Sequence, residues 1–123
     1  MIFSISKNKE FEKDNVAEKM EQAKIIMNEN VCKEIDPEEL AEKLNISYSW
    51  FRKTFKKYTG YSPAKYFQEL KLRKAKQILI NTSYPVKEIC FMIGYTSTEH
   101  FSNLFKKNTG LTPLEYRSFG KDE

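Results

Sequence analysis

The sequence predicts an all-α fold of about seven helices, in which two helix-turn-helix subdomains are joined by a long linker helix. Glycine and proline number only four each among 123 residues, and no long run alternates between apolar and polar residues, which disfavours a β-rich fold. Apolar residues recur at helical spacing between helix-start and helix-end signals. One helical segment also occurs twice.

The repeated segment covers residues 47–66 and 97–116. Their sequences, SYSWFRKTFKKYTGYSPAKY and STEHFSNLFKKNTGLTPLEY, are identical at nine of twenty positions. Further upstream, the apolar positions of residues 40–45 match those of residues 89–94 at an offset of 49 instead of 50. The same helical unit is therefore expected twice, and the second copy has one extra residue in the turn between its two helices.

Both helices of the first unit have readable ends. Asp36 is expected to cap a helix over residues 37–44, which begins with proline and carries glutamate three residues after the cap. After a short turn, Ser47 caps a second helix over residues 48–58, which ends at Gly60. Two helices of this length separated by a short turn form the helix-turn-helix pattern.

The second unit repeats these signals, with a helix from Pro85, a turn at residues 94–96, Ser97 as the next cap and Gly110 after the last helical residue. A last short helix follows residue 112. Between the units, a helix of about 18 residues spans roughly 27 Å, which approaches the roughly 34 Å of one DNA turn. A spacer of this length could hold two recognition helices, here called reading helices, on one face of DNA.

The domain organisation follows from these elements. An amphipathic helix over residues 11–31 is expected to pack on the first unit, because Val16, Met20, Ala23 and Met27 fall on one stripe. The expected segments are a tail or interdomain segment (1–10), a homeodomain-like first subdomain (11–61), the linker helix (62–81), a second such subdomain (82–119) and a tail (120–123).

Charge is concentrated in the middle of the chain. Residues 1–46 carry seven lysines against eleven acidic residues, residues 47–81 carry nine lysines and arginines against Glu69 alone, and residues 82–123 carry five charges of each sign. A basic centre of this kind suggests a surface that binds a polyanion. A solvated lysine-rich helix would give the same charge distribution.

Other functional classes find little support. Cys32 and Cys90 match no zinc spacing and are expected to be reduced and structural, and with a single histidine no metal site is expected. The chain has no glycine-rich phosphate loop and no histidine paired with a nucleophile, so we expect neither an enzyme nor a cofactor. Because no apolar run approaches the roughly 20 residues of a membrane span, a cytoplasmic protein is expected.

The second helix of the first unit is the candidate reading helix. Its inward stripe is expected to contain Phe51, Thr54, Phe55 and Tyr58. The opposite stripe offers side chains that can bond base edges in the major groove. The expected base-contacting residues are Ser49, Arg52 and Lys53. The expected phosphate-contacting residues are Ser47, Lys56 and Lys57.

The second reading helix keeps this arrangement with different chemistry. Its inward stripe is expected to contain Phe101, Leu104, Phe105 and Asn108. The expected base-contacting residues are Thr98, Glu99, Ser102 and Asn103, none of which is cationic. The expected phosphate-contacting residues are Ser97, Lys106 and Lys107. The second unit is therefore expected to bind more weakly than the first.

The chain resembles the AraC/XylS family of bacterial transcription activators, specifically their C-terminal DNA-binding domain. The resemblance covers roughly residues 15–119, and the second unit carries it best. Its matching segments are ICFMIGY (89–95), FSNLFKK (101–107), GLTP (110–113) and YR (116–117). The resemblance implies a seven-helix domain whose third and sixth helices enter adjacent major-groove segments. The family often has arginine near Asn103, so its absence implies weak readout by the second unit.

Family members usually join this domain to a sensor or receiver domain, and an excised C-terminal part of such a regulator is slightly favoured over a naturally short member. The expected function is sequence-specific binding of double-stranded DNA for bacterial transcription regulation, through activation that recruits RNA polymerase. The alternative is a helical protein-interaction module with weak or non-specific DNA binding. His100 is expected to pack or to approach a phosphate rather than to catalyse.

Overall fold

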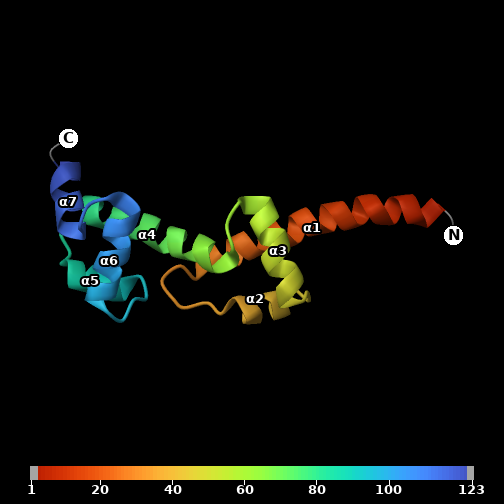
Figure 1. The fold of residues 1–123 in the computed structure, drawn as a ribbon, viewed down its shortest axis with the longest axis horizontal. Coiled ribbons are helices and arrows are strands. Elements are labelled where there is room, and N and C mark those ends of the chain that lie inside the picture. Colours follow the sequence, from red (N-terminus) through yellow and green to blue (C-terminus); the bar gives the residue numbers. More distant parts are fainter. Residues whose placement is uncertain (1–2, 122–123) are drawn as a thin grey trace. The chain divides into compact units, whose positions relative to one another are not determined.

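The computed structural model describes the backbone of residues 3–121 and the side chains of residues 15–120, and within these limits it is all-helical (Figure 1). This confirms the predicted all-α fold. The seven described helices are α1 (Phe3–Glu29), α2 (Pro37–Lys43), α3 (Tyr48–Thr59), α4 (Pro63–Asn81), α5 (Val86–Met92), α6 (Thr98–Thr109) and α7 (Pro113–Lys121). None of the helices described is both long and apolar enough to cross a membrane.

The helices form two compact units. The first contains the chain up to Asn30 and Ile35–Tyr66, and the second contains Val31–Glu34 and the chain from Phe67 onward. The boundary therefore falls inside α4, whereas the sequence suggested a separate linker over residues 62–81. The reason is burial, because apolar residues of α4 form part of the core of the second unit.

Helix α1 is longer than the sequence suggested. Its backbone is helical from Phe3, so most of the segment expected to be a tail over residues 1–10 belongs to the helix. Residues 3–10 contain neither glycine nor proline, so nothing in their sequence terminates a helix that is already formed downstream.

The core of the first unit is built where three helices face one another. Phe51 and Phe55 of α3 are fully buried, and their rings lie 5.4 Å apart in an edge-on arrangement. Burying one phenylalanine side chain stabilises a fold by about 1.5–3 kcal/mol. The other buried apolar residues from the first two helices and the turn are Met20, Ala23, Met27, Leu40, Ala41 and Leu44.

The second unit has the same core. Phe101 and Phe105 of α6 are fully buried, as are the other members of the cluster, Leu72, Ala75, Leu79, Ile89, Cys90 and Ile93. The ring centroids of Phe105 and Tyr116 lie 5.3 Å apart, with an angle of 82° between the ring planes. For the equivalent pair, Phe55 and Tyr66, the centroid distance is 5.2 Å and the interplanar angle is 85°. The sequence repeat is thus reproduced in the packing of its aromatic rings.

Both reading helices begin and end as the sequence predicted. The hydroxyl of Ser47 accepts a hydrogen bond from the Trp50 amide at 3.2 Å, and that of Ser97 accepts one from the His100 amide at 3.1 Å. Gly60 and the repeat-equivalent Gly110 follow the last helical residues with φ of 87° and 84°. These caps satisfy backbone groups that have no partner inside a helix.

The turns also differ by one residue, as predicted. Residues 44–47 separate α2 from α3, whereas residues 93–97 separate α5 from α6. Both turns need one residue with positive φ, which is Asn45 at 59° in the first and Gly94 at 89° in the second. Asparagine and glycine are the residues that adopt this conformation most readily.

Candidate nucleic-acid interface

Helix α3 presents one buried face and one exposed polar face. All residues expected to contact bases or phosphates from the first unit are exposed: Ser47, Ser49, Arg52, Lys53, Lys56 and Lys57. They lie on the side of the helix away from the buried Phe51 and Phe55. Arginine and lysine can bond guanine O6 and N7, and serine can bond several bases. This face therefore has the chemistry for reading a major groove.

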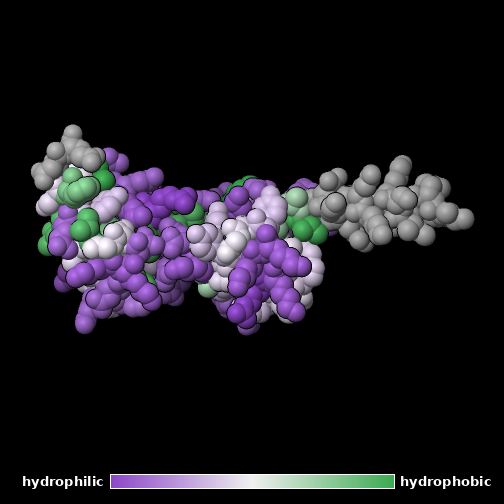
Figure 2. Space-filling model, turned by 45° about the horizontal axis from the view of Figure 1, so that its top comes forward, coloured by the Kyte–Doolittle hydropathy of each residue, from purple (hydrophilic) through white to green (hydrophobic). Residues whose placement is uncertain are grey.

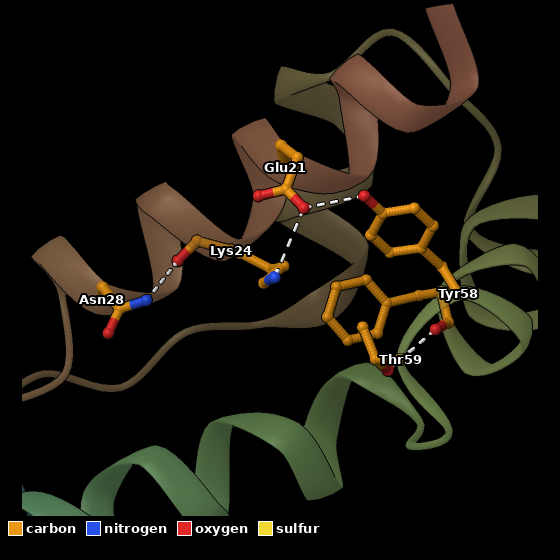
Figure 3. Close-up of polar contacts among 6 residues, drawn as sticks. Glu21, Lys24, Asn28, Tyr58 and Thr59 are labelled. Atoms are coloured by element: carbon orange, nitrogen blue, oxygen red, sulfur yellow. Dashed lines mark hydrogen bonds and ion pairs between the residues drawn. The ribbon is translucent and has the colours of Figure 1, made fainter. Parts of the chain in front are cut away.

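The expected inward stripe of α3 is wrong at its last position. Tyr58 is 44% exposed, and its hydroxyl donates a hydrogen bond to Oε1 of Glu21 on α1 at 2.7 Å (Figure 3). Lys24 lies 3.3 Å from the same carboxylate oxygen. The hydrogen bonds from Tyr58 and Lys24 lower the pKa of Glu21. The phenol is thus held at the surface by a carboxylate, because its length carries its polar end out of the core.

Helix α6 places its expected contacts less uniformly. Its expected residues that are exposed are Ser97, Glu99, Asn103, Lys106 and Lys107, whereas Thr98 and Ser102 are half-buried. Burial raises the pKa of the Cys90 thiol, and a hydrogen bond with Thr98 acts in the opposite direction. Thr98 therefore already interacts with the core side of the helix. Among the four expected base-contacting residues, Glu99 and Asn103 are the most open to a ligand.

Asn108 is a second correction to an inward stripe. It is exposed, and its amide nitrogen donates to both carboxylate oxygens of Glu69 on α4, at 3.0 and 3.2 Å. Asn108 occupies the same place in the repeat as Tyr58. In both units, the last turn of the reading helix is therefore tied by a carboxylate to the long helix of its own unit.

The electrostatics of the two reading helices differ strongly. Helix α3 carries Arg52, Lys53, Lys56 and Lys57 and no acidic residue, whereas α6 carries Glu99 in its first turn and Lys106 and Lys107 in its last. A carboxylate at a helix N-terminus is favoured by the helix dipole but repels a nearby phosphate. Attraction for a polyanion is therefore greater at α3.

Two aromatic residues of the first α3 turn were not singled out from the sequence. Tyr48 is 37% and Trp50 is 39% exposed, beside the expected contact Ser49. The repeat carried a signal for both of them, because their counterparts in the second unit are the polar Thr98 and His100. The His100 ring meets Tyr95 edge-on at 6.1 Å, which fits the expected packing role.

Lys71 was also not singled out from the sequence, because it is a charged residue that is buried. It is only 6% exposed, and its ammonium donates to the carbonyl oxygens of Val31, Lys33 and Ile93 at 2.8, 2.7 and 2.5 Å. Lysine is rarely buried unless its charge is compensated, so sequence patterning assigns it to the surface. Burial lowers the pKa of Lys71.

The two cysteines are free thiols in different environments. Cys90 is fully buried in the second core, with its sulfur 3.6 Å from the carbonyl oxygen of Tyr95. Cys32 is exposed, so the expectation that both cysteines serve the packing is wrong for Cys32.

The surface around these helices is mainly hydrophilic in the view of Figure 2. Apolar side chains interrupt it on the unit that contains α7, where Leu114 and Phe119 are 64% and 63% exposed. Two capped helices, each with buried phenylalanines on one side and hydrogen-bonding side chains on the other, define a DNA-binding domain of the helix-turn-helix class.

Comparison with known proteins specifies the family. A profile described as "Helix-turn-helix domain" matches residues 40–118. A transcriptional regulator with an AraC-type DNA-binding domain from Chromobacterium violaceum is 30% identical, with a TM-score of 0.80 over 85% of this chain and 93% of that one. The chain therefore belongs to the AraC-type helix-turn-helix family of DNA-binding transcription regulators.

Two further relatives show how much of each protein the similarity covers. The transcriptional regulator GbdR of Pseudomonas aeruginosa is 33% identical over 99 residues, which are 80% of this chain and 27% of GbdR. The chain thus spans about a quarter of the length of this curated relative. The DNA-binding domain of AdpA, solved in complex with a target DNA, shares the fold at 22% identity, with a TM-score of 0.79 over 84% of this chain and 93% of that one.

Proposed function

We propose that this chain reads double-stranded DNA with α3 and α6 in successive major-groove segments, as the DNA-binding part of a bacterial transcription activator. The observation that carries the proposal is the exposed face of α3, where hydrogen-bonding and basic side chains stand opposite two buried phenylalanines. The target DNA bound by the related fold of AdpA supports double-stranded DNA as the ligand.

The first unit supplies most of the affinity in this proposal. Arg52 and Lys53 read base edges together with Ser49, and Lys56 and Lys57 neutralise phosphates. The hydroxyl of Ser47 accepts the Trp50 amide but keeps its own proton, which it can donate to a phosphate oxygen. Each neutralised phosphate releases counterions, so this half of the binding is strongly salt-dependent.

The second unit tunes the specificity. Asn103 suits an adenine and Glu99 can accept from cytosine N4, and both side chains are exposed. Thr98 and Ser102 contribute less, because each is half-buried. Ser97, Lys106 and Lys107 contact the phosphate backbone. The carboxylate of Glu99 at the start of α6 repels phosphates and base edges that offer only hydrogen-bond acceptors, so it lowers the affinity for sequences that place such groups there.

We also propose protein partners for this DNA-binding domain. The matched segment is 27% of GbdR, and we infer that, where this chain is part of a longer regulator, a sensor or receiver domain controls when it acts. Activation is proposed to proceed by recruitment of RNA polymerase, in the cytoplasm where the bacterial chromosome lies. We assign no catalytic role to this part of the protein.

Selection of bound duplexes from a random pool tests the proposal. The expected result is a motif with two half-sites about one helical turn apart, one strongly and one weakly specified. Binding should weaken steeply as salt rises. Enrichment of no motif, or duplex binding insensitive to salt, would contradict the proposal and favour the protein-interaction alternative.

A further inference from the structure

A lysine of the long helix contacts the helix-turn-helix turn in each unit. In the first unit, Nζ of Lys19 on α1 donates to the carbonyl oxygen of Leu44 at 2.6 Å. In the second, Nζ of Lys71 on α4 donates to the carbonyl oxygen of Ile93 at 2.5 Å. Leu44 and Ile93 are the C-cap residues of α2 and α5, so each carbonyl stands where the turn toward the reading helix begins.

This shared contact belongs to a longer repeat than residues 40–66 and 89–116. A shift of 52 residues superimposes the sequences of α1 and α4, with Lys19, Ala23, Lys24 and Ile26 matching Lys71, Ala75, Lys76 and Ile78. The buried Met20 and Met27 fall on the buried Leu72 and Leu79 by the same shift.

The ends of these two helices agree as well. The side-chain amide of Asn30 donates to the carbonyl oxygen of Ile26 at 2.8 Å, and the hydroxyl of the equivalent Thr82 donates to that of Ile78 at 2.6 Å. The whole three-helix unit is therefore present twice, and the lysine contact is one of its repeated parts.

The contact has a clear physical role. The last carbonyls of a helix have no partner within it, and a cation there also interacts favourably with the helix dipole. A charge-assisted hydrogen bond to such a carbonyl is shorter and stronger than a neutral one. It fixes the position of the residue from which the turn departs.

The two lysines differ in how completely they are enclosed. Lys19 is half-buried, whereas Lys71 is buried and also bonds the carbonyls of Val31 and Lys33. A Cβ at Gly94 would lie 2.8 Å from Nζ of Lys71, so the second turn closes directly over the ammonium. A buried charge persists only where such partners compensate its lost hydration.

We infer that Lys19 and Lys71 are matched positioning residues, each of which orients the reading helix of its own unit by holding the carbonyl at the start of the turn. The inference rests on the proposed function for its DNA readout. Its distinctive consequence is locality, because Lys19 affects only the base reading of α3 and Lys71 only that of α6.

The test replaces each lysine by methionine, which keeps the length of the side chain and removes the charge. Affinity is measured for the selected duplex and for versions with either half-site scrambled. Discrimination at a half-site is the ratio of the affinity for the selected duplex to the affinity for the duplex with that half-site scrambled. Lys19→Met should lower this ratio about tenfold at the α3 half-site, which corresponds to the loss of one base contact. It should keep the discrimination at the α6 half-site, and Lys71→Met should show the reverse.

Three comparisons separate positioning from other roles. Lys19→Arg should retain discrimination, because Lys19 is half-buried and arginine can donate to the same carbonyl, whereas Lys71→Arg should lose part of it, because the second turn closes over the ammonium and leaves little room for the larger guanidinium. Gln22→Met and Lys74→Met, which replace exposed residues at equivalent positions of the same helices, are the matched controls and should leave half-site discrimination unchanged. A lysine that bound phosphate would reduce the salt slope by about one when replaced, whereas Lys19→Met and Lys71→Met should leave it unchanged.

Amide hydrogen exchange tests the positioning role without DNA, and it applies even if Lys71→Met does not fold or if no motif is selected. Amide hydrogen exchange should accelerate in residues 45–47 of Lys19→Met, and in residues 94–97 of whichever Lys71 variant folds, while the other turn keeps its protection. Absence of a selected motif would refute the proposed function alone. Equal loss of discrimination at both half-sites, or unchanged exchange in both turns, would overturn the positioning role.

Discussion

The hydroxyl of Tyr58, in the last turn of α3, donates to Oε1 of Glu21 on α1 at 2.7 Å (Figure 3). The repeat-equivalent Asn108 of α6 bonds the carboxylate of Glu69 on α4. Each reading helix is thus tied at its end to the long helix of its unit, by different chemistry. The polar faces offered to DNA are held at both the first and the last turn.

Tyr58→Phe should lower the melting temperature at neutral pH, because it removes the donor to Glu21. The folded-state pKa of Glu21 lies below the ordinary value of 4.5, chiefly because of this hydrogen bond. Its stabilising contribution is therefore present above pH 4.5 and is lost as the pH falls through the folded pKa. The melting difference between wild type and Tyr58→Phe should shrink across that range. A difference independent of pH would contradict this account, and Tyr61→Phe, which alters another exposed tyrosine, is the control.

Gly94→Ala should destabilise the second unit by more than Gly110→Ala. Both glycines have positive φ, 89° and 84°, which costs alanine about 1–3 kcal/mol. An added Cβ at Gly94 would also lie 3.0 Å from the carbonyl oxygen of Cys32, whereas at Gly110 it would meet nothing within 4 Å. Chemical denaturation of the two variants measures the difference, and equal losses of stability would show that the turn can yield without cost.

Tyr95 should ionise at a higher pH than an ordinary tyrosine. Burial raises its pKa to about 12, from an ordinary value of 10.0. Because the raised pKa favours the neutral phenol in the folded state, its contribution to stability is present below pH 10 and is lost as the pH rises toward 12. Absorbance titration of phenolate should show a late step that Tyr95→Phe removes. A late step that persists in this variant would assign it to another residue.

Arg52→Ala and Lys57→Ala should weaken DNA binding in different ways. Arg52→Ala should cost about 1–3 kcal/mol and relax specificity at one base position. Lys57→Ala should weaken binding to all sequences alike and reduce the salt slope by about one. Anisotropy titrations on the selected duplex and on its single-base variants, at several salt concentrations, separate the two. Loss of base specificity in Lys57→Ala would reverse the assigned roles.

The elements with strong local signals were predicted well from the sequence. The caps at Ser47 and Ser97, the C-terminal glycines and the extra residue of the second turn all follow from residue types at fixed positions. The start of α1 was not predicted, because residues 3–10 contain no glycine or proline to mark where the helix begins. Tyr58 and Asn108 were assigned inward by periodicity alone, which ignores the reach of a carboxylate on a neighbouring helix.

The positioning lysines escaped prediction for two physical reasons. The match between α1 and α4 needs a shift of 52, whereas the rest of the repeat follows shifts of 49 and 50, so it is weak in any single register. Lysine is also assigned to the surface by default, and only the fold brings three carbonyls around Lys71. Exposure on α3 and α6 identifies the side chains that are available to DNA, whereas the base that each one contacts depends on the sequence of the bound duplex.

The central claim is that two unequal units read one bipartite site. It is tested most directly by affinity at fixed salt for the selected duplex and for the two versions with one half-site scrambled. The α3 half-site is identified as the one whose scrambling abolishes any further effect of Arg52→Ala. Scrambling it should cost more affinity than scrambling the α6 half-site, because α3 carries four cationic residues and no acidic one. Equal costs, or a larger cost at the α6 half-site, would contradict the claim.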